Sequence, residues 1–296
     1  MRSSIGPLLI LASGVSYGAF APGAQILSRA GMSSYEILIF PFLVGLVYVL
    51  PLVAMRFRLF NKRALKFYGI YGLINLGTFL APLMGIALGV SVGVVVLLFY
   101  TQPLWSVLFG KILLHEPITK QKALANFVAI SGIVFLAEPW TGSLLGNPWG
   151  MFVSLLGGVF LALWIVMGRK GGLNRFHPVM ITFHVRSFTV VWALLTLPLL
   201  AALLPLPNLT GFDPANFQAN FMFILGYAIV TGPMADMLFY KGVVVVPASV
   251  AGVLMLAEPV SAILIAAVFL SQAITLNLVI AAGLILLSNY LILRKS

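Results

Sequence analysis

Hydrophobic residues in this chain fall into ten long runs that are separated by short polar connections. Each run is long enough to cross about 30 Å of hydrocarbon as an α-helix, because each helical residue advances the chain by about 1.5 Å. The pattern therefore predicts ten transmembrane helices, at residues 5–28, 34–55, 65–89, 92–114, 122–139, 148–168, 178–204, 217–240, 246–270 and 275–293.

Lysine and arginine are concentrated in alternate connections. The connection after the second run contains Arg56, Arg58, Lys62, Arg63 and Lys66, whereas the fifth, seventh and ninth connections contain no basic residue. Short loops rich in lysine and arginine remain in the cytoplasm. We therefore expect both termini to be cytoplasmic.

Composition places the whole chain in a lipid bilayer and narrows the classes of function. Hydrophobic residues make up 61% and charged residues 8% of the chain, and the mean hydropathy is +1.12. The net charge of +11 comes mainly from the predicted cytoplasmic loops, where it faces anionic lipid headgroups rather than nucleic acid. We expect a multi-pass protein of a cell inner membrane.

Several kinds of chemistry have no candidate residues. The chain has no cysteine, which excludes disulfides, thiolate metal sites and cysteine nucleophiles. It has no phosphate-binding loop of the GxxxxGK[ST] type. Its six acidic residues and three histidines are scattered along the chain, so we expect no metal site, no cofactor and no catalytic residues.

The chain matches itself at two offsets. An offset of 156 pairs Val94 with Val250 and Pro103 with Pro259, and an offset of 144 pairs Gly14 with Gly158. Both offsets divide the chain into residues 1–143 and 144–296, with five crossings each. An odd number of crossings returns the chain to the opposite side, so the predicted fold is an all-α membrane protein made of two inverted repeats, as in many secondary transporters.

Motifs in both halves resemble the drug/metabolite transporter superfamily, in its ten-helix EamA-type branch. The resemblance rests on the segments Tyr100-Thr101-Gln102-Pro103, Leu113-Leu114-His115-Glu116, Leu256-Ala257-Glu258-Pro259-Val260 and Phe269-Leu270-Ser271-Gln272. The chain departs from the family's Leu-Gly-Glu pattern at His115, and again at Ser271 and Gln272 in the second half.

The resemblance implies alternating-access transport of a small organic molecule without an obligatory protein partner, so that a monomer is sufficient. Family members transport amino acids, nucleotide sugars, sugar phosphates, purines or cationic drugs. We expect an amino acid exporter, and the wealth of aromatic residues favours aromatic amino acids. Efflux of drugs or organic cations is the first alternative, and a membrane-embedded enzyme acting on lipid is an alternative of another class.

Glu258 is the strongest single candidate for substrate binding or coupling. It lies near the middle of the ninth predicted helix, roughly 18 Å from either end, where a carboxylate must face the interior. It could bind an amino group, exchange a proton, or hydrogen-bond a neighbouring helix. The repeat places Gln102 at the equivalent position.

Pro103 and Pro259 each remove a helical hydrogen bond and free the carbonyl groups of Phe99 and Met255. Met255 is therefore a candidate acceptor for an ammonium group. On the fourth helix Gln102 and Tyr100 point in nearly opposite directions, and we favour the Gln102 face, which also carries Trp105 and Ser106, while retaining Tyr100.

Further polar residues lie inside other predicted helices. Arg186 and Asp236 lie at similar depth on the seventh and eighth helices, and we expect them to pair, although Arg186 could instead bind a substrate carboxylate. His184 is a candidate proton relay or a satisfied interior histidine. Tyr17, Asn75, Phe79 and Trp164 complete the predicted substrate-binding residues.

Overall fold

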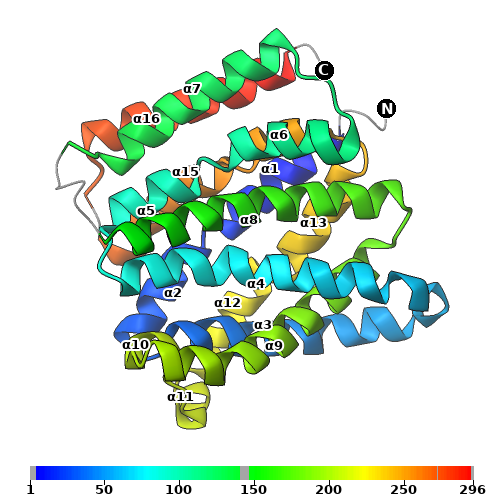
Figure 1. Ribbon diagram of the computed structural model, residues 1–296, viewed down its shortest axis with the longest axis vertical. Helices are drawn as coiled ribbons and strands as arrows, with labels where there is room; N and C mark the ends of the chain where they lie inside the picture. The colour runs from blue at the N-terminus through cyan, green and yellow to red at the C-terminus, as the bar shows by residue number, and fades with distance from the viewer. Residues whose placement is uncertain (1–4, 141–146, 272, 295–296) are drawn as a thin grey trace.

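The computed structural model describes residues 5–140, 147–271 and 273–294, and all the regular structure in these ranges is helical (Figure 1). Long helices lie side by side in a bundle. In chain order the elements are α1 (Ile5–Tyr17), α2 (Phe20–Arg29), α3 (Ser34–Ala54), η1 (Phe57–Leu59), η2 (Lys62–Ala64), α4 (Leu65–Ala87), α5 (Val92–Phe99), α6 (Gln102–Leu114), α7 (Lys120–Ala137), α8 (Pro148–Leu173), α9 (Pro178–Leu203), α10 (Pro207–Thr210), α11 (Pro214–Ala219), α12 (Phe221–Thr231), α13 (Pro233–Val243), α14 (Ala248–Leu254), α15 (Ala257–Leu270) and α16 (Leu276–Leu293).

In the described part of the chain, ten helical spans are long and apolar enough to cross a membrane. The prediction of ten membrane-spanning helices is confirmed. The spans are Ile5–Arg29, Ser34–Ala54, Lys62–Ala87, Val92–Leu114, Lys120–Ala137, Pro148–Leu173, Pro178–Leu203, Phe221–Val243, Ala248–Leu270 and Leu276–Leu293. The eighth span starts later than predicted, because the separate short helix α11 ends at Ala219 and α12 begins at Phe221.

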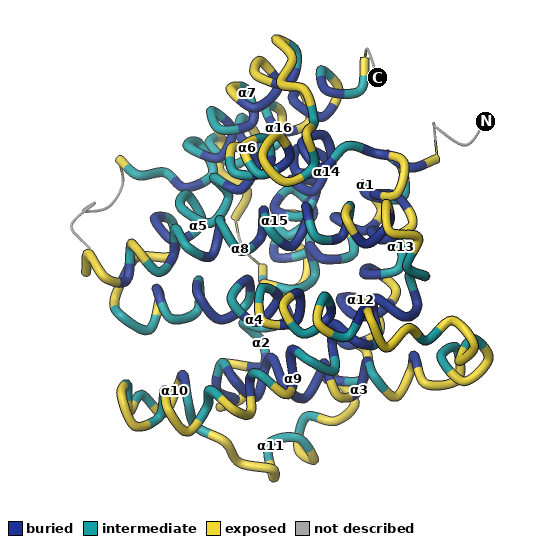
Figure 2. Tube along the Cα trace, turned by 45° about the vertical axis from the view of Figure 1, so that its right-hand side comes forward, coloured by how far each residue is buried: buried dark blue, intermediate teal, exposed yellow. Residues whose placement is uncertain are grey.

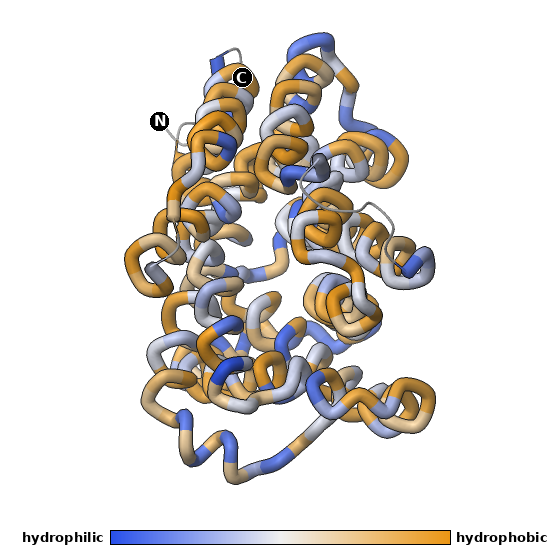
Figure 3. Tube along the Cα trace, turned by 90° about the vertical axis from the view of Figure 1, so that its left-hand side faces the viewer, coloured by the Kyte–Doolittle hydropathy of each residue, from blue (hydrophilic) through white to orange (hydrophobic). Residues whose placement is uncertain are grey.

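The surface of the bundle is apolar along the helices. Large hydrophobic side chains such as Val47, Phe127 and Val268 are exposed, and Figure 3 shows hydrophobic residues along most of the helical surface, with many hydrophilic ones in loops and near helix ends. Buried residues gather where helices face one another (Figure 2). An apolar surface of this extent needs lipid rather than water around it.

Four of these spans are interrupted, and each therefore consists of two helices. The breaks lie between α1 and α2, between α5 and α6, between α12 and α13, and between α14 and α15. The second helix of each pair has a proline in its first turn, where the missing N–H costs nothing; these prolines are Pro22, Pro103, Pro233 and Pro259. Breaks at Pro103 and Pro259 agree with the sequence pattern, whereas those near Gly18 and Gly232 were not predicted.

Two of the breaks are packed against glycines. A Cβ atom added to Gly158 of α8 would lie 2.6 Å from the carbonyl oxygen of Phe99, and one added to Gly14 of α1 would lie 3.4 Å from that of Met255. At the sequence offsets of 144 and 156 these are equivalent contacts, each joining one predicted repeat to the other. The predicted boundary between residues 143 and 144 lies outside the described residues.

The turn between α13 and α14 is held from both sides by charged groups. Arg169 of α8 donates through Nη1 to the carbonyl oxygens of Val243 and Val244 at the end of α13. Glu116 accepts hydrogen bonds from the Ala248 and Ser249 amides and from the Ser249 hydroxyl, at 2.7, 3.2 and 2.8 Å. The cation thus meets a helix C-terminus and the carboxylate a helix N-terminus, which are the favourable arrangements. We call Arg169 and Glu116 the charged clamp.

Candidate functional site

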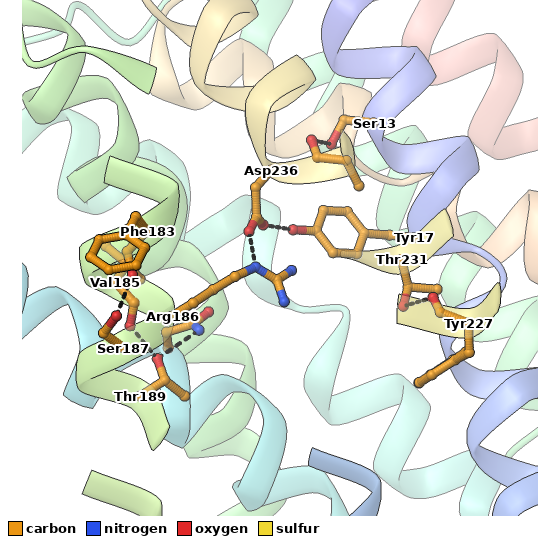
Figure 4. A network of polar contacts seen from close by, with 12 residues as sticks. Ser13, Tyr17, Phe183, Val185, Arg186, Ser187, Thr189, Tyr227, Thr231 and Asp236 are labelled. Atoms are coloured by element: carbon orange, nitrogen blue, oxygen red, sulfur yellow. Dashed lines mark hydrogen bonds and ion pairs between the residues drawn. The ribbon is translucent and has the colours of Figure 1, made fainter. Parts of the chain in front are cut away.

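Arg186 of α9 and Asp236 of α13 form an ion pair inside the bundle (Figure 4). The Nε atom of Arg186 lies 2.5 Å from Oδ2 of Asp236, and the two side chains are only 4% and 8% exposed. The hydroxyl of Tyr17, on α1, donates to the other oxygen of Asp236. Burying a charge costs free energy unless the charge is paired and hydrogen-bonded. The contacts that join α1, α9 and α13 here are therefore ones whose loss would strongly destabilise the fold.

The outer end of the guanidinium is not used by the protein. Arg186 donates to Asp236 through Nε, and its Cζ lies 4.5 Å from the centroid of the Phe42 ring. No hydrogen bond joins its Nη1 or Nη2 to an acceptor among the described residues, and Figure 4 shows these two nitrogens pointing away from Asp236. Four N–H donors remain available there.

A small cavity lies at this end of Arg186. The room between the side chains is about 10 Å³, about the space that one water molecule requires. Most of the wall is apolar and much of it is aromatic. The cavity is lined by Phe20, Ile37, Pro41, Phe42, Phe79, Arg186, Tyr227, Ala228, Thr231 and Gly232.

The break in the eighth span brings a helix N-terminus to the same cavity. Helix α13 begins at Pro233, directly after Gly232, which lines the cavity. The N-terminus of a helix carries a partial positive charge and amide donors, and interrupted helices of transporters use such ends to bind anionic groups. The cavity therefore faces the cationic side chain of Arg186 and the break at which α12 ends and α13 begins.

An aromatic cluster packs on the other side of the ion pair. Trp164 stacks on Phe239 with ring centroids 4.3 Å apart and meets Tyr17 edge to face at 6.1 Å. Tyr71 donates a hydrogen bond of 2.8 Å to the Trp164 carbonyl. Tyr17 and Trp164, predicted as repeat-related binding residues, therefore lie together, but as buried packing around Asp236 rather than on the cavity wall.

Glu258 lies at the start of α15, and its polar neighbour is Tyr100. The Tyr100 hydroxyl is the hydrogen-bonding neighbour of the Glu258 carboxylate. Tyr227 lies within electrostatic range of both Arg186 and Glu258. Tyr227 therefore lies near both of the predicted ionisable centres.

Gln102 has a different position from the one we favoured. Its side chain is 1% exposed; Nε2 donates to the Gly252 carbonyl at 2.6 Å, and Oε1 accepts from Ser106 at 2.9 Å. Its polar atoms are thus used to join α6 to α14, because a carbonyl group near the break of the ninth span needs a donor. Tyr100, rather than Gln102, reaches the carboxylate.

Met255 and the two prolines shape the breaks. Met255 is 3% exposed, and its carbonyl oxygen accepts a hydrogen bond of 2.9 Å from the Glu258 amide. The freed carbonyl predicted at Met255 is thus occupied within the break itself. Pro103 and Pro259 lie in the first turns of α6 and α15, where they direct the second halves of the fourth and ninth spans.

Asn75 and Phe79 lie one turn apart on α4 and have separate tasks. Asn75 donates to the Thr189 hydroxyl at 2.9 Å and so joins α4 to α9. Phe79 lines the cavity and packs against Phe20 and Phe42, with centroid distances of 4.9 and 5.3 Å. Of Asn75 and Phe79, only Phe79 could contact a molecule bound in the cavity.

His184 lies away from the ion pair, in an aromatic stack. Its ring lies parallel to Tyr68, with centroids 4.7 Å apart, and to Phe60 at 5.5 Å. Nδ1 lies 2.8 Å from the Met180 carbonyl oxygen. The contacts fit a satisfied interior histidine, and they link α9 to the segment that precedes α4.

Eight of the ten cavity residues were not identified from the sequence, among them Phe20, Phe42, Tyr227 and Thr231. Aromatic residues are common throughout this chain, so residue type alone does not distinguish rings that line the cavity from rings that pack between helices. The adjacent Gly232-Pro233 pair was a usable signal, because it marks a helix break within an apolar run. Among the described residues, no group of three or more histidine, aspartate or glutamate side chains could hold a metal ion.

Comparison with known proteins agrees with this architecture. A crystal structure of another protein superposes with a TM-score of 0.76 at 20% sequence identity, covering 99% of this chain and 98% of the other. An uncharacterized transporter of Archaeoglobus fulgidus is 26% identical over 206 residues, which are 70% of this chain and 69% of the relative. The model of the EamA-like transporter family matches twice, at residues 4–137 and 148–294. The chain therefore belongs to the EamA-like transporter family and is a multi-pass membrane protein.

Proposed function

We propose that this protein is a secondary transporter that exports amino acids, preferentially aromatic ones, across a cell inner membrane by alternating access. The observation that supports it best is the cavity in which the free end of Arg186 meets the rings of Phe20, Phe42, Phe79 and Tyr227. A guanidinium suits a carboxylate, and the rings suit an aromatic side chain.

The second ionisable centre fits the other end of an amino acid. Glu258 lies within electrostatic range of Tyr227, which lines the cavity, and offers a carboxylate that an ammonium group could reach when the cavity opens. The repeat organisation supports a rocking motion of one half against the other, because the Gly14 and Gly158 contacts join the predicted halves in equivalent ways. We propose the two inverted repeats, with both termini in the cytoplasm, as the moving units.

Transport in liposomes tests this proposal. Purified protein is reconstituted into vesicles preloaded with one unlabelled amino acid, and uptake of the same labelled amino acid is followed for wild type and Glu258→Gln, with and without a pH gradient. Counterflow of phenylalanine, tyrosine or tryptophan that exceeds counterflow of small aliphatic amino acids supports the proposal. Absence of counterflow with every amino acid, from a monodisperse protein, would sink it.

Efflux of organic cations is the second candidate, and the Glu258–Tyr100 pair favours it. A half-buried carboxylate beside a tyrosine ring can bind an ammonium through charge and cation–π attraction. This function predicts transport of cations that lack a carboxylate and strict dependence on Glu258. The same vesicles, loaded with a lipophilic cation, separate the two functions.

A further inference from the structure

Among the residues that the structure describes, the one charged side chain that lines the cavity is the cation Arg186. The lining residues include the guanidinium of Arg186 and no aspartate or glutamate. Asp236 lies on the opposite side of the guanidinium and already receives Nε of Arg186 and the Tyr17 hydroxyl. A ligand in the cavity therefore meets unused N–H donors rather than a carboxylate.

The cavity offers an ammonium group weaker interaction partners than it offers a carboxylate. The hydroxyls of its two polar neutral residues donate to backbone carbonyls, Tyr227 to Phe20 at 3.2 Å and Thr231 to Tyr227 at 2.8 Å. Lone pairs on these neutral oxygens and the faces of the aromatic rings remain for an amine, and no carboxylate faces it, because Glu258 does not line the cavity. Hydrogen bonds between a guanidinium and a carboxylate are about twice as strong as neutral ones.

We propose that this cavity recognises the carboxylate and the apolar body of an aromatic organic acid, and that the substrate's α-amino group is dispensable. The proposal rests on the transport function proposed above and defines its substrate class as aromatic carboxylates, of which aromatic amino acids are one kind. The carboxylate lies against Nη1 and Nη2 of Arg186, and the ring lies among Phe20, Phe42 and Phe79.

Asp236 is a positioning residue in this arrangement. By holding Nε from one side, it fixes the plane of the guanidinium and leaves the Nη fork pointing away from Asp236 (Figure 4). Phe42 fixes the same plane from its face, with the ring centroid 4.5 Å from Cζ. A preorganised fork loses little conformational freedom when it binds a carboxylate.

The observed cavity must widen before it accepts such a ligand. About 10 Å³ is room for a water molecule, so rings of the wall have to move. Phe20 and Tyr227 lie next to the breaks in the first and eighth spans, which are the points where these spans can bend.

Three related ligands test the proposal directly on the wild-type protein. Phenylalanine carries both groups, phenylpropanoate lacks the amine, and phenylethylamine lacks the carboxylate. Their binding is measured in detergent by titration calorimetry and by the rise in Tm, which reports ligand binding to the folded state. We expect phenylpropanoate to bind within about threefold of phenylalanine, and phenylethylamine at least about tenfold more weakly.

A matched pair of variants then assigns the binding to Arg186. Arg186→Lys keeps the charge but removes the planar fork, and we expect it to weaken phenylpropanoate binding about tenfold or more. Arg169→Lys is the control, because Arg169 is also partly buried and also contacts α13, but it does not line the cavity. Phe79→Ala is a second variant in case Arg186→Lys does not fold; it should weaken aromatic acids without affecting a short aliphatic acid.

Two outcomes overturn the proposal. One is that phenylethylamine binds as tightly as phenylalanine while phenylpropanoate does not bind. The other is that Glu258→Gln, but not Arg186→Lys, abolishes binding of phenylpropanoate. Binding is measured without transport, so the proposed binding site is tested independently of counterflow in vesicles. Counterflow of amino acids but not of other aromatic acids would contradict the proposed substrate class and leave the proposed transport function intact.

Discussion

At the scale of single residues, the ion pair between Arg186 and Asp236 should dominate stability in the middle of the bundle. Both side chains are almost inaccessible, so removing one partner leaves an uncompensated charge, at a cost of about 3 kcal/mol. Replacing both by uncharged residues removes that penalty. We expect Asp236→Asn and Arg186→Met each to lower the free energy of unfolding by about that amount, and the double variant by much less than the sum.

Denaturant unfolding in detergent micelles, followed by tryptophan fluorescence, measures this cycle. Additive effects of the two substitutions would show that the charges do not interact, and the ion pair would then be wrong. Ser187→Ala is a suitable control, because Ser187 is adjacent on α9 but bonds only to the Phe183 carbonyl of its own helix.

His177 gives a second prediction, at the membrane surface. It caps α9, with Nδ1 accepting the Val179 amide at 3.2 Å, which requires the neutral ring. Burial, together with the nearby Arg56 and Lys241, lowers the pKa of His177 below 6.5. Its contribution to stability is therefore fully present above pH 6.5 and is lost as the pH falls through the lowered pKa.

The expected result is a fall in Tm between pH 7.5 and about pH 5 that is smaller in His177→Asn, because asparagine caps a helix without titrating. Thermal unfolding at several pH values measures it. If wild type and variant lose the same Tm on acidification, the cap does not titrate in this range.

The sequence reveals a site residue when its type is unusual among its neighbours in the chain. Arg186 and Asp236 stand out, because charges inside apolar runs are rare and their similar depth suggests a pair. Phe42 and Tyr227 do not stand out among many aromatic residues. The direction of Gln102 depends on the Gly252 carbonyl of α14, close to the break between α14 and α15, which a pattern along one helix does not contain.

At the scale of helices, close approach at the breaks should make certain glycines irreplaceable. An alanine at Gly158 would place Cβ 2.6 Å from the Phe99 oxygen, whereas Gly283 of α16 has no atom within 4 Å of such a Cβ. We expect Gly158→Ala to cost about 1–3 kcal/mol through forced separation of α8 from the break. Gly283→Ala should be neutral or stabilise by less than about 1 kcal/mol.

Denaturant unfolding and the yield of monodisperse protein measure both variants side by side. Equal stability of Gly158→Ala and Gly283→Ala would mean that α8 can move away from the break without losing stability. The contact between the two repeats would then contribute nothing to the free energy of unfolding. Gly14→Ala is an intermediate case, because its nearest contacts are 3.2 and 3.4 Å.

Helices were predictable where length and polarity alone determine them. The bounds of most spans agree with the apolar runs to within a few residues, because the hydrocarbon thickness sets the length. Breaks at Pro103 and Pro259 were recognisable from proline inside an apolar run. The break near Gly18 has no proline directly beside it, so the pattern gives little sign of it. The break at Gly232 carried the Gly232-Pro233 signal, but average hydropathy is the same on both sides of it and does not mark a break within a span.

At the scale of the whole molecule, the two predicted halves differ in the residues at the positions of the charged clamp. The charged clamp of Glu116 and Arg169 holds the turn between α13 and α14. At the same offsets of 156 and 144, the other half has the neutral amides Gln272 and Gln25; Gln272 lies outside the described residues. Charged groups at helix ends stabilise by up to about 1 kcal/mol each, so the two closed states of the alternating-access cycle proposed above should differ in energy.

We expect the charged clamp to favour the conformation that is closed on the cytoplasmic side, since Glu116 can bond to α14 only while the ends of α6 and α14 meet. Glu116→Gln should shift the population toward cytoplasmic opening.

Because the natural chain has no cysteine, a single cysteine at Ala228, which lines the cavity, can be labelled with an impermeant thiol reagent from either side of oriented vesicles. Labelling from the cytoplasmic side should rise severalfold in Glu116→Gln and remain unchanged in Glu138→Gln, which removes a charge elsewhere. Equal labelling in all three proteins would mean that the clamp fixes the turn without biasing the cycle, and the difference between Glu116 and Gln272 would then have no bearing on the direction in which the transporter rests.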